Sequence, residues 1–143
     1  MNNFMSLKIF AKVGNESFAR SCVAAFAAKL NPSVDQIDDI KTAVSEAVTN
    51  SIVHANLSED DLISIDVSLD DSAIHITISD EGVGIDDVDK ARRPFYTTKT
   101  DQERSGLGFT LMDAFMDSLD VKSSDSGVCV KMTKNILNIS KAS

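Results

Sequence analysis

Cysteine, positive charge and long apolar runs are all scarce in this 143-residue chain, and each scarcity excludes a class of protein. The two cysteines, Cys22 and Cys129, form neither a CxxC pair nor a zinc-binding spacing, so we expect reduced thiols. The longest apolar run, residues 22–28, has seven residues, whereas a membrane-spanning helix needs about 20. The N-terminus has no cationic start followed by an apolar stretch, so no signal peptide is expected. These absences predict a soluble cytoplasmic protein that does not insert into membranes.

The scarcity of positive charge is uneven along the chain. Against 22 Asp and Glu there are 14 Lys and Arg, a formal net charge of −8. Phosphate contacts need clustered basic side chains, so we expect no direct DNA binding. Between Lys41 and Lys90 there is no Lys or Arg but twelve acidic residues. Five basic residues then lie within fifteen positions: Lys90, Arg92, Arg93, Lys99 and Arg104. A solvated loop would explain this cluster, but its place between two glycine motifs makes it a candidate functional segment.

Size and composition predict one globular domain over residues 1–143. The 43% hydrophobic and 25% charged contents are typical of a folded domain, and a chain of ~150 residues buries enough surface for one core. Alternating apolar residues predict five strands, at residues 7–13, 63–69, 74–78, 119–123 and 127–133. The order of strands and helices predicts an α+β two-layer sandwich, with helices on one face of a mixed, mostly antiparallel sheet.

Apolar residues at helical spacing predict three helices. Asn15 is expected to cap the first, Ser33 and Gln36 fit a capping box for a longer second helix, and the third begins near Leu107. The expected buried stripes are Phe18, Cys22, Phe26 and Leu30; Ile37, Ile40, Val44, Ala47, Val48 and Ala55; and Leu111, Phe115 and Leu119. Residues 80–108 lack periodicity, and loops this long are usually functional or disordered.

The second helix carries a polar strip at the edge of its apolar stripe. Glu46, Asn50 and His54 are spaced four residues apart and cover only ~80° of the helical wheel. A solvated helix face is the common explanation of such a strip. If the strip lines a pocket instead, the Glu46 carboxylate could accept a proton and the Asn50 amide oxygen could ligate Mg²⁺.

Two glycine motifs follow in the second half of the chain. D-E-G-V-G at residues 80–84 comes directly after a predicted strand, where the Asp80 carboxylate could accept a hydrogen bond from an exocyclic amine such as that of adenine. R-S-G-L-G at residues 104–108 opens the third helix, where free N–H groups favour a phosphate. An ordinary turn and an ordinary helix cap would also explain them. Neither motif is a P-loop or a Rossmann fingerprint.

Taken in order, these motifs resemble those of one superfamily. E-A-V-T-N-S-I-V-H-A at residues 46–55, D-E-G-V-G and R-S-G-L-G resemble the N, G1 and G2 boxes of the GHKL ATPases and kinases, whose fold is the Bergerat ATP-binding sandwich. F-Y-T-T-K at residues 95–99 resembles the F-box of histidine-kinase lids. N-E-S-F-A-R at residues 15–20 and E-R-S-G-L-G-F-T-L-M at residues 103–112 are similar to the anti-sigma-F factors of endospore formation, a family of serine protein kinases. The likeness covers essentially the whole chain.

The resemblance implies a role for each matched residue. Glu46 would be the general base for a serine hydroxyl, and Asn50 would ligate the Mg²⁺ of bound ATP. Asp80 would bind the adenine amine, with Thr133 beside it through a water molecule. Gly82 and Gly84 would let the adenine approach. The residues that would hold phosphates are Lys99, Arg104, Ser105, Gly106 and Gly108, with Arg104 also catalytic. Residues 85–105 would form a lid that the γ-phosphate orders.

The resemblance also implies a homodimeric anti-sigma factor with protein kinase activity. With ATP it would hold a sporulation sigma factor away from RNA polymerase. It would also phosphorylate a serine on a STAS-domain anti-anti-sigma protein, and ADP would favour that second partner. Three alternatives remain: a general-stress anti-sigma kinase, a detached histidine-kinase catalytic domain, and a nucleotide-independent sigma-binding module with a vestigial site. The intact set of Glu46, Asn50 and Asp80 argues against the vestigial site.

Overall fold

Five strands form one sheet in the computed structural model of the chain, which describes residues 2–54, 58–85, 88–93 and 108–136. The strands are β1 (Asn3–Phe10), β2 (Leu62–Leu69), β3 (Ala73–Asp80), β4 (Ser118–Ser124) and β5 (Gly127–Asn135). They lie in the order β1-β2-β3-β5-β4, and every neighbouring pair is antiparallel. The described sheet is therefore antiparallel throughout, without the parallel pairs of a mixed sheet.

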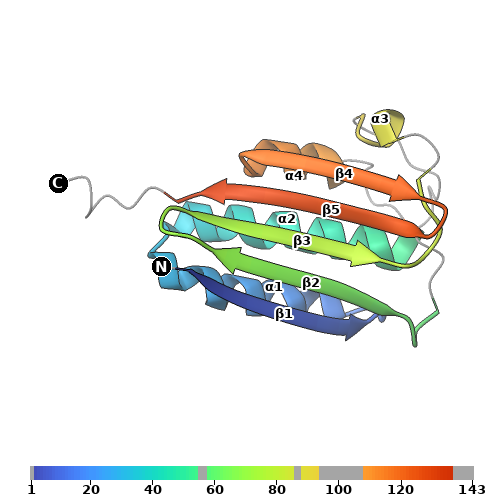
Figure 1. The fold of residues 1–143 in the computed structure, drawn as a ribbon, viewed down its shortest axis with the longest axis horizontal. Helices are drawn as coiled ribbons and strands as arrows, with labels where there is room; N and C mark the ends of the chain where they lie inside the picture. The colour runs from blue at the N-terminus through green and yellow to red at the C-terminus, as the bar shows by residue number, and fades with distance from the viewer. Residues whose placement is uncertain (1, 55–57, 86–87, 94–107, 137–143) are drawn as a thin grey trace.

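Helices cover one face of this sheet and complete the predicted α+β two-layer sandwich (Figure 1). The helices on this face are α1 (Asn15–Ala27), the short 3-10 helix η1 (Ala28–Leu30), α2 (Val34–His54) and α4 (Gly108–Phe115), whereas α3 (Val88–Ala91) lies beyond the β4 edge of the sheet in Figure 1. The core lies between α1, α2 and α4 and the inner face of the sheet. The four-residue helix α3 falls within the segment for which the sequence predicts no regular structure. Among the described helices, none combines the length and apolar character that a membrane span requires.

The first strand lies nearer the N-terminus than its predicted range. β1 begins at Asn3 and ends at Phe10, because the backbone N–H of Lys12 donates to the Phe10 carbonyl oxygen (2.8 Å) and turns the chain away from the sheet. The prediction that the strand reaches Val13 is wrong, since the Val13 side chain is 93% exposed. The other four strands occur where the alternation of apolar residues predicts them.

α1 buries a different face from the predicted one. Gly14, at φ +98°, occupies the cap position, while the side-chain amide of Asn15 donates to the Phe10 carbonyl oxygen (2.9 Å). The buried residues of α1 are Ala19, Val23 and Ala27. Of the expected stripe, Phe18 is 57% exposed, Cys22 and Phe26 are half-buried, and Leu30, which lies in η1, is buried as predicted. Both sets have a spacing of four, so periodicity alone cannot choose between them. Packing against α2 selects the smaller side chains, because the distance between two packed helices depends on the side chains at their contact.

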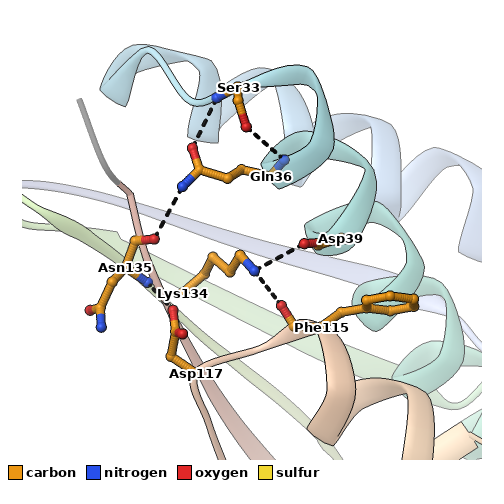
Figure 2. A network of polar contacts seen from close by, with 7 residues as sticks. All are labelled: Ser33, Gln36, Asp39, Phe115, Asp117, Lys134 and Asn135. Carbon is orange, nitrogen blue, oxygen red and sulfur yellow. Dashed lines mark hydrogen bonds and ion pairs between the residues drawn. The ribbon is translucent and has the colours of Figure 1, made fainter. Parts of the chain in front are cut away.

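α2 begins at the predicted capping box and presents its apolar stripe to the core. The Ser33 N–H donates to Gln36 Oε1 (2.9 Å), and the Gln36 N–H donates to Ser33 Oγ (3.1 Å), as Figure 2 shows. The box satisfies two N–H groups that would otherwise lack partners at the helix start. The buried residues of α2 are Ile40, Ala43, Val44, Ala47, Val48 and Ser51. Ile37 is half-buried, and the predicted stripe member Ala55 lies outside the described residues.

α4 is also rotated relative to its prediction. Phe109 and Met112 are buried, whereas Leu111 and Phe115 of the expected stripe are only half-buried. Leu119, also expected on this helix, belongs to β4. The methionines predicted to fill the core do so: Met112, Met116 and Met132 are all buried.

A group of polar contacts fixes the C-terminal end of α4 to α2 and β5 (Figure 2). Lys134 Nζ donates to the Phe115 carbonyl oxygen (2.5 Å) and to Asp39 Oδ2 (3.0 Å). The Asn135 N–H donates to Asp117 Oδ2 (2.6 Å). A cation at a helix C-terminus also interacts favourably with the helix dipole. Lys134, Asp39 and the Phe115 carbonyl group are termed the α4 clamp below.

Candidate functional site

Asp80 ends β3 with its carboxylate buried against α2. The residue is 7% exposed and points to the inner face of the sheet, as Ile76 and Ile78 do. Ser51 Oγ donates to Asp80 Oδ2 (2.8 Å), and the Gly82 N–H donates to Asp80 Oδ1 (3.0 Å). No Lys or Arg in the described part of the chain forms an ion pair with this carboxylate. Because a carboxylate has about four acceptor positions, Asp80 can accept further hydrogen bonds from a ligand.

The β4–β5 hairpin packs closely on the segment that follows Asp80. Gly127 has a φ of +139°, and a Cβ there would lie 2.0 Å from the Asp80 carbonyl oxygen. A Cβ on Gly84 would lie 2.0 Å from the Ser124 carbonyl oxygen. Backbone therefore excludes a side chain at both positions. Gly84 has this packing requirement in addition to its predicted role beside the adenine.

Glu46 and Asn50 lie side by side on α2 where α4 begins. A Cβ on Gly108 would lie 3.1 Å from Asn50 Nδ2, 3.2 Å from Asn50 Oδ1 and 3.3 Å from Glu46 Oε2. Three of the predicted site residues therefore meet at the N-terminal end of α4. A carboxylate and an amide beside helix N–H groups suit a phosphate that carries Mg²⁺.

The donor set around Asn50 fits a nucleotide-bound metal rather than a metal held by protein alone. Among the residues outside the gaps, no three His, Cys, Asp or Glu side chains gather as a metal site. Mg²⁺ in nucleotide sites is commonly held by one or two protein groups together with phosphate oxygens and water. A single amide oxygen from Asn50 is compatible with that arrangement.

α2 connects the two groups of site residues. Asn50 and Ser51 are consecutive, so their side chains point about 100° apart around the helix axis. Ser51 contacts Asp80 at the end of β3, while Asn50 lies against Gly108 of α4. One helical turn thus carries both the serine that donates to Asp80 and the candidate metal ligand Asn50.

Glu46 also borders an open cavity of about 330 Å³ between α1 and α2. The cavity is lined by Arg20, Asp38, Lys41, Thr42, Ser45 and Glu46. Arg20 Nη1 lies 3.6 Å from Glu16 Oε2, and Ser45 Oγ donates to the same oxygen (2.7 Å). These contacts join the start of α1 to α2. Glu46 therefore borders both the cavity and the N-terminal end of α4.

Thr133 does not lie beside Asp80, and that prediction is wrong. The strand register pairs Thr133 with His75, near the start of β3, whereas Asp80 ends the strand. Continuing the same register along β5 places Val128 beside Asp80. A motif read from sequence gives no offset between paired strands, so a threonine five residues away was indistinguishable from a neighbour.

The side chain of Thr133 belongs to a polar group on the outer face of the sheet. His75 Nδ1 lies 3.1 Å from Thr133 Oγ1, and His75 Nε2 lies 2.8 Å from Asp70 Oδ2. Asp70 Oδ1 also accepts hydrogen bonds from the N–H groups of Ser72 (2.9 Å) and Ala73 (2.8 Å). The His75 hydrogen bond and these backbone donors lower the pKa of Asp70 to about 2. This group closes the β2–β3 hairpin.

Four residues predicted to hold phosphates lie outside the described ranges: Lys99, Arg104, Ser105 and Gly106. Their roles stay predictions. Of the same basic cluster, Arg92 is described. Its Nη2 donates to both carboxylate oxygens of Asp113 on α4, each at 2.9 Å. This ion pair joins the segment after α3 to the helix that contacts Asn50.

Sequence reasoning missed two residues of the site, Ser51 and Gly127. Ser51 carried a usable signal, because it is a hydroxyl on a stripe that is otherwise apolar, and buried hydroxyls need partners. Gly127 carried no such signal. A glycine in a hairpin is expected for turn geometry alone, and nothing in the sequence connects it to the Asp80 carbonyl oxygen.

A family model described as "Histidine kinase-like ATPase domain" matches residues 11–134. The anti-sigma F factor of Caldanaerobacter subterraneus subsp. tengcongensis is 53% identical over 136 residues, which cover 94% of this chain and 95% of the relative. That of Geobacillus kaustophilus is 49% identical over 138 residues, covering 95% and 94%. The chain belongs to the anti-sigma F factor family. The resemblance to anti-sigma-F factors and to GHKL proteins is thereby confirmed.

Solved structures share the fold of this anti-sigma F family member. The RsbU and RsbW domains of a Mycobacterium tuberculosis protein match with a TM-score of 0.70 and 15% identity, covering 94% of this chain and 32% of that one. The SiaB–SiaC complex from Pseudomonas aeruginosa matches with a TM-score of 0.63 and 10% identity, covering 90% and 88%. At these identities the likeness concerns the fold, and it agrees with the predicted sandwich.

Proposed function

We propose that this chain binds ATP or ADP with Mg²⁺ and acts as an anti-sigma factor that is also a serine protein kinase. The observation that carries the proposal is the buried Asp80 carboxylate, which has two neutral donors and no cation among the described residues, beside the meeting point of Glu46, Asn50 and Gly108. Membership of a family with a histidine kinase-like ATPase domain supports the nucleotide. An adenine amine would supply the further donor that the Asp80 carboxylate can accept.

In the proposed reaction, one side chain accepts the serine proton and others stabilise the charge of the phosphates. The Glu46 carboxylate would take the proton from a substrate serine hydroxyl. The serine oxygen would then bond to the γ-phosphorus of ATP while the bond from that phosphorus to the leaving ADP breaks. The position of Glu46 beside both the cavity and α4 supports this role, because a base must reach the hydroxyl it deprotonates. Mg²⁺, when bound with the nucleotide at Asn50, would offset phosphate charge. Arg104 would add positive charge to the phosphates.

The proposed partners come from the relatives. Since the matching relatives are named anti-sigma F factors, we propose a sporulation sigma factor as the ATP-dependent partner, in preference to a general-stress sigma factor. A STAS-domain anti-anti-sigma protein would be the substrate phosphorylated on serine. The active species would be a cytoplasmic homodimer. Co-purification with ATP and with ADP would test both partners, because the sigma factor should be retained with ATP and the STAS protein with ADP.

Calorimetry with MgADP tests the nucleotide site directly. We expect Asp80→Asn to weaken ADP binding about 10- to 100-fold, because a hydrogen bond to a charged acceptor contributes roughly 1.5–3 kcal/mol. Asp66→Asn is the matched control, since Asp66 lies on β2 and bonds to Ser6 on the exposed face of the sheet. Equal affinities of wild type and Asp80→Asn would remove Asp80 from the site. Absence of ADP binding in the wild type would support the nucleotide-independent module instead.

A further inference from the structure

Ser51 occupies a position that packing alone would fill with an apolar residue. It is 7% exposed and belongs to the stripe of α2 whose other buried members are all apolar. A buried hydroxyl without a partner is costly. A helical serine can satisfy itself by donating to a carbonyl of its own helix four residues back. Ser51 Oγ instead donates across to Asp80 Oδ2 at 2.8 Å, which joins α2 to the end of β3.

The hydrogen bond from Ser51 restrains the last side-chain torsion of Asp80, which would otherwise rotate easily. The last side-chain torsion of an aspartate has a broad energy profile, so the plane of its carboxylate is poorly defined without partners. In Asp80 both oxygens are held: Oδ2 by Ser51, and Oδ1 by the Gly82 N–H at 3.0 Å. The Gly82 bond comes from the loop that follows β3, whereas the Ser51 bond comes from the 21-residue helix α2, whose inner face packs into the core. The helix therefore supplies the firmer of the two supports.

We propose that Ser51 is the positioning residue that orients the Asp80 carboxylate to accept a hydrogen bond from the 6-amino group of adenine. It thereby contributes to the selection of adenine nucleotides over purine nucleotides without that donor. The inference rests on the proposed nucleotide binding at Asp80. Ser51 does not touch the nucleotide in this proposal; its effect passes through the carboxylate alone.

The test compares two ligands that differ only in the donor. Calorimetry measures the affinity of wild type and Ser51→Ala for MgADP and for the 5′-diphosphate of purine riboside, which is ADP without its 6-amino group. We expect Ser51→Ala to weaken MgADP binding about 5- to 20-fold, less than the loss expected for Asp80→Asn, because the variant leaves the carboxylate in place and removes only the bond that orients it. Binding of the amine-free nucleotide should change less than about twofold, because its base offers Asp80 no donor.

Two controls separate positioning from a structural effect. Ser79→Ala removes a hydroxyl from the residue next to Asp80, on the opposite face of β3, and should leave both affinities unchanged. In an Asp80→Asn background, Ser51→Ala should add little further loss, since its target is already altered. Thermal unfolding confirms that each variant is folded.

The outcomes distinguish this inference from the proposed function. If Ser51→Ala binds MgADP as wild type does, or weakens both ligands equally, Ser51 does not orient Asp80 and the inference is overturned while nucleotide binding stands. If the wild type binds neither ligand, the proposed function is wrong and the inference falls with it.

Discussion

Glu46 borders two features of the site, the N-terminal end of α4 and the cavity between α1 and α2. One carboxylate oxygen, Oε2, would lie 3.3 Å from a Cβ placed on Gly108, and the same side chain lines the cavity between α1 and α2. A side chain that only bound the metal ion of a nucleotide would need to border the N-terminal end of α4 and nothing else. A general base needs both, because it must reach a hydroxyl that comes from a second protein while the phosphate lies on its other side.

For this reason we expect Glu46→Gln to separate binding from chemistry. Glutamine keeps the size of the side chain and loses the basic carboxylate. Transfer of phosphate to the proposed STAS-domain substrate should slow by about 10²- to 10⁴-fold, while MgADP affinity stays within about twofold. Single-turnover transfer assays and calorimetry measure the two quantities. Glu59→Gln, which removes an exposed carboxylate from a turn, is the control for charge. Normal transfer by Glu46→Gln would assign the base to another group.

Two glycines with positive φ allow a second residue-scale prediction. A Cβ on Gly14 (φ +98°) would meet no atom of the described residues within 4 Å, whereas a Cβ on Gly127 (φ +139°) would overlap the Asp80 carbonyl oxygen at 2.0 Å. Gly14→Ala should therefore lower the free energy of unfolding by only the backbone term, about 1–2 kcal/mol. Gly127→Ala should cost clearly more and should also weaken MgADP binding, because it displaces Asp80. Urea unfolding checks the order, and equal losses would contradict the close approach.

At the scale of elements, α1 and α4 mark the limit of sequence reasoning. Their existence and places follow from periodicity and capping, yet both bury a face one residue away from the predicted one. In α1, Ala19 is buried and Phe18 is exposed, because contact with α2 favours a small side chain over a more hydrophobic one. Periodicity records where apolar residues lie, and which apolar series faces inward depends on the partner helix.

The site shows the same limit. Glu46 and Asn50 lie together because helix spacing is a local feature, whereas their meeting with Gly108 depends on the packing of α4 on α2 and was implied only by the family resemblance of the motifs. Thr133 failed because its position depends on the register between β3 and β5, which no local pattern records. Ser51 was missed since its partner is a residue on another element.

The α4 clamp gives a prediction for an element. Lys134 is mostly buried, with its side chain 13% exposed, and it donates both to Asp39 and to the Phe115 carbonyl oxygen at the end of α4. Lys134→Met keeps the apolar stem but removes the ammonium, which we expect to lower the free energy of unfolding by about 1.5–3 kcal/mol. Lys131→Met on the same strand is the control, because Lys131 is exposed and should change stability by less than about 0.5 kcal/mol. Chemical denaturation compares the two, and similar values would show that the clamp is not stabilising.

At the scale of the whole molecule, we expect acid to lower the free energy of unfolding through Asp70 in the β2–β3 hairpin. The pKa of Asp70 is about 2 in the folded chain, against an ordinary value of 3.8, so the unfolded state binds its proton more readily. The stabilisation is therefore complete above pH 3.8 and is lost as the pH falls toward 2. Unfolding by urea at several pH values should show a steeper loss of stability in wild type than in Asp70→Asn over this window. Parallel curves would contradict the assignment.

The position of β5 has a consequence for biosynthesis. This strand is the last in the described sheet, yet it lies between β3 and β4 inside it. While it is still in the ribosome, β3 presents an unpaired edge, and such edges readily join other chains. Lys134 lies on the same strand, so α4 also lacks its anchor during that interval. A nascent chain interrupted before residue 127 would lack the strand that joins β4 to β3, so the native sheet cannot form until β5 has left the ribosome.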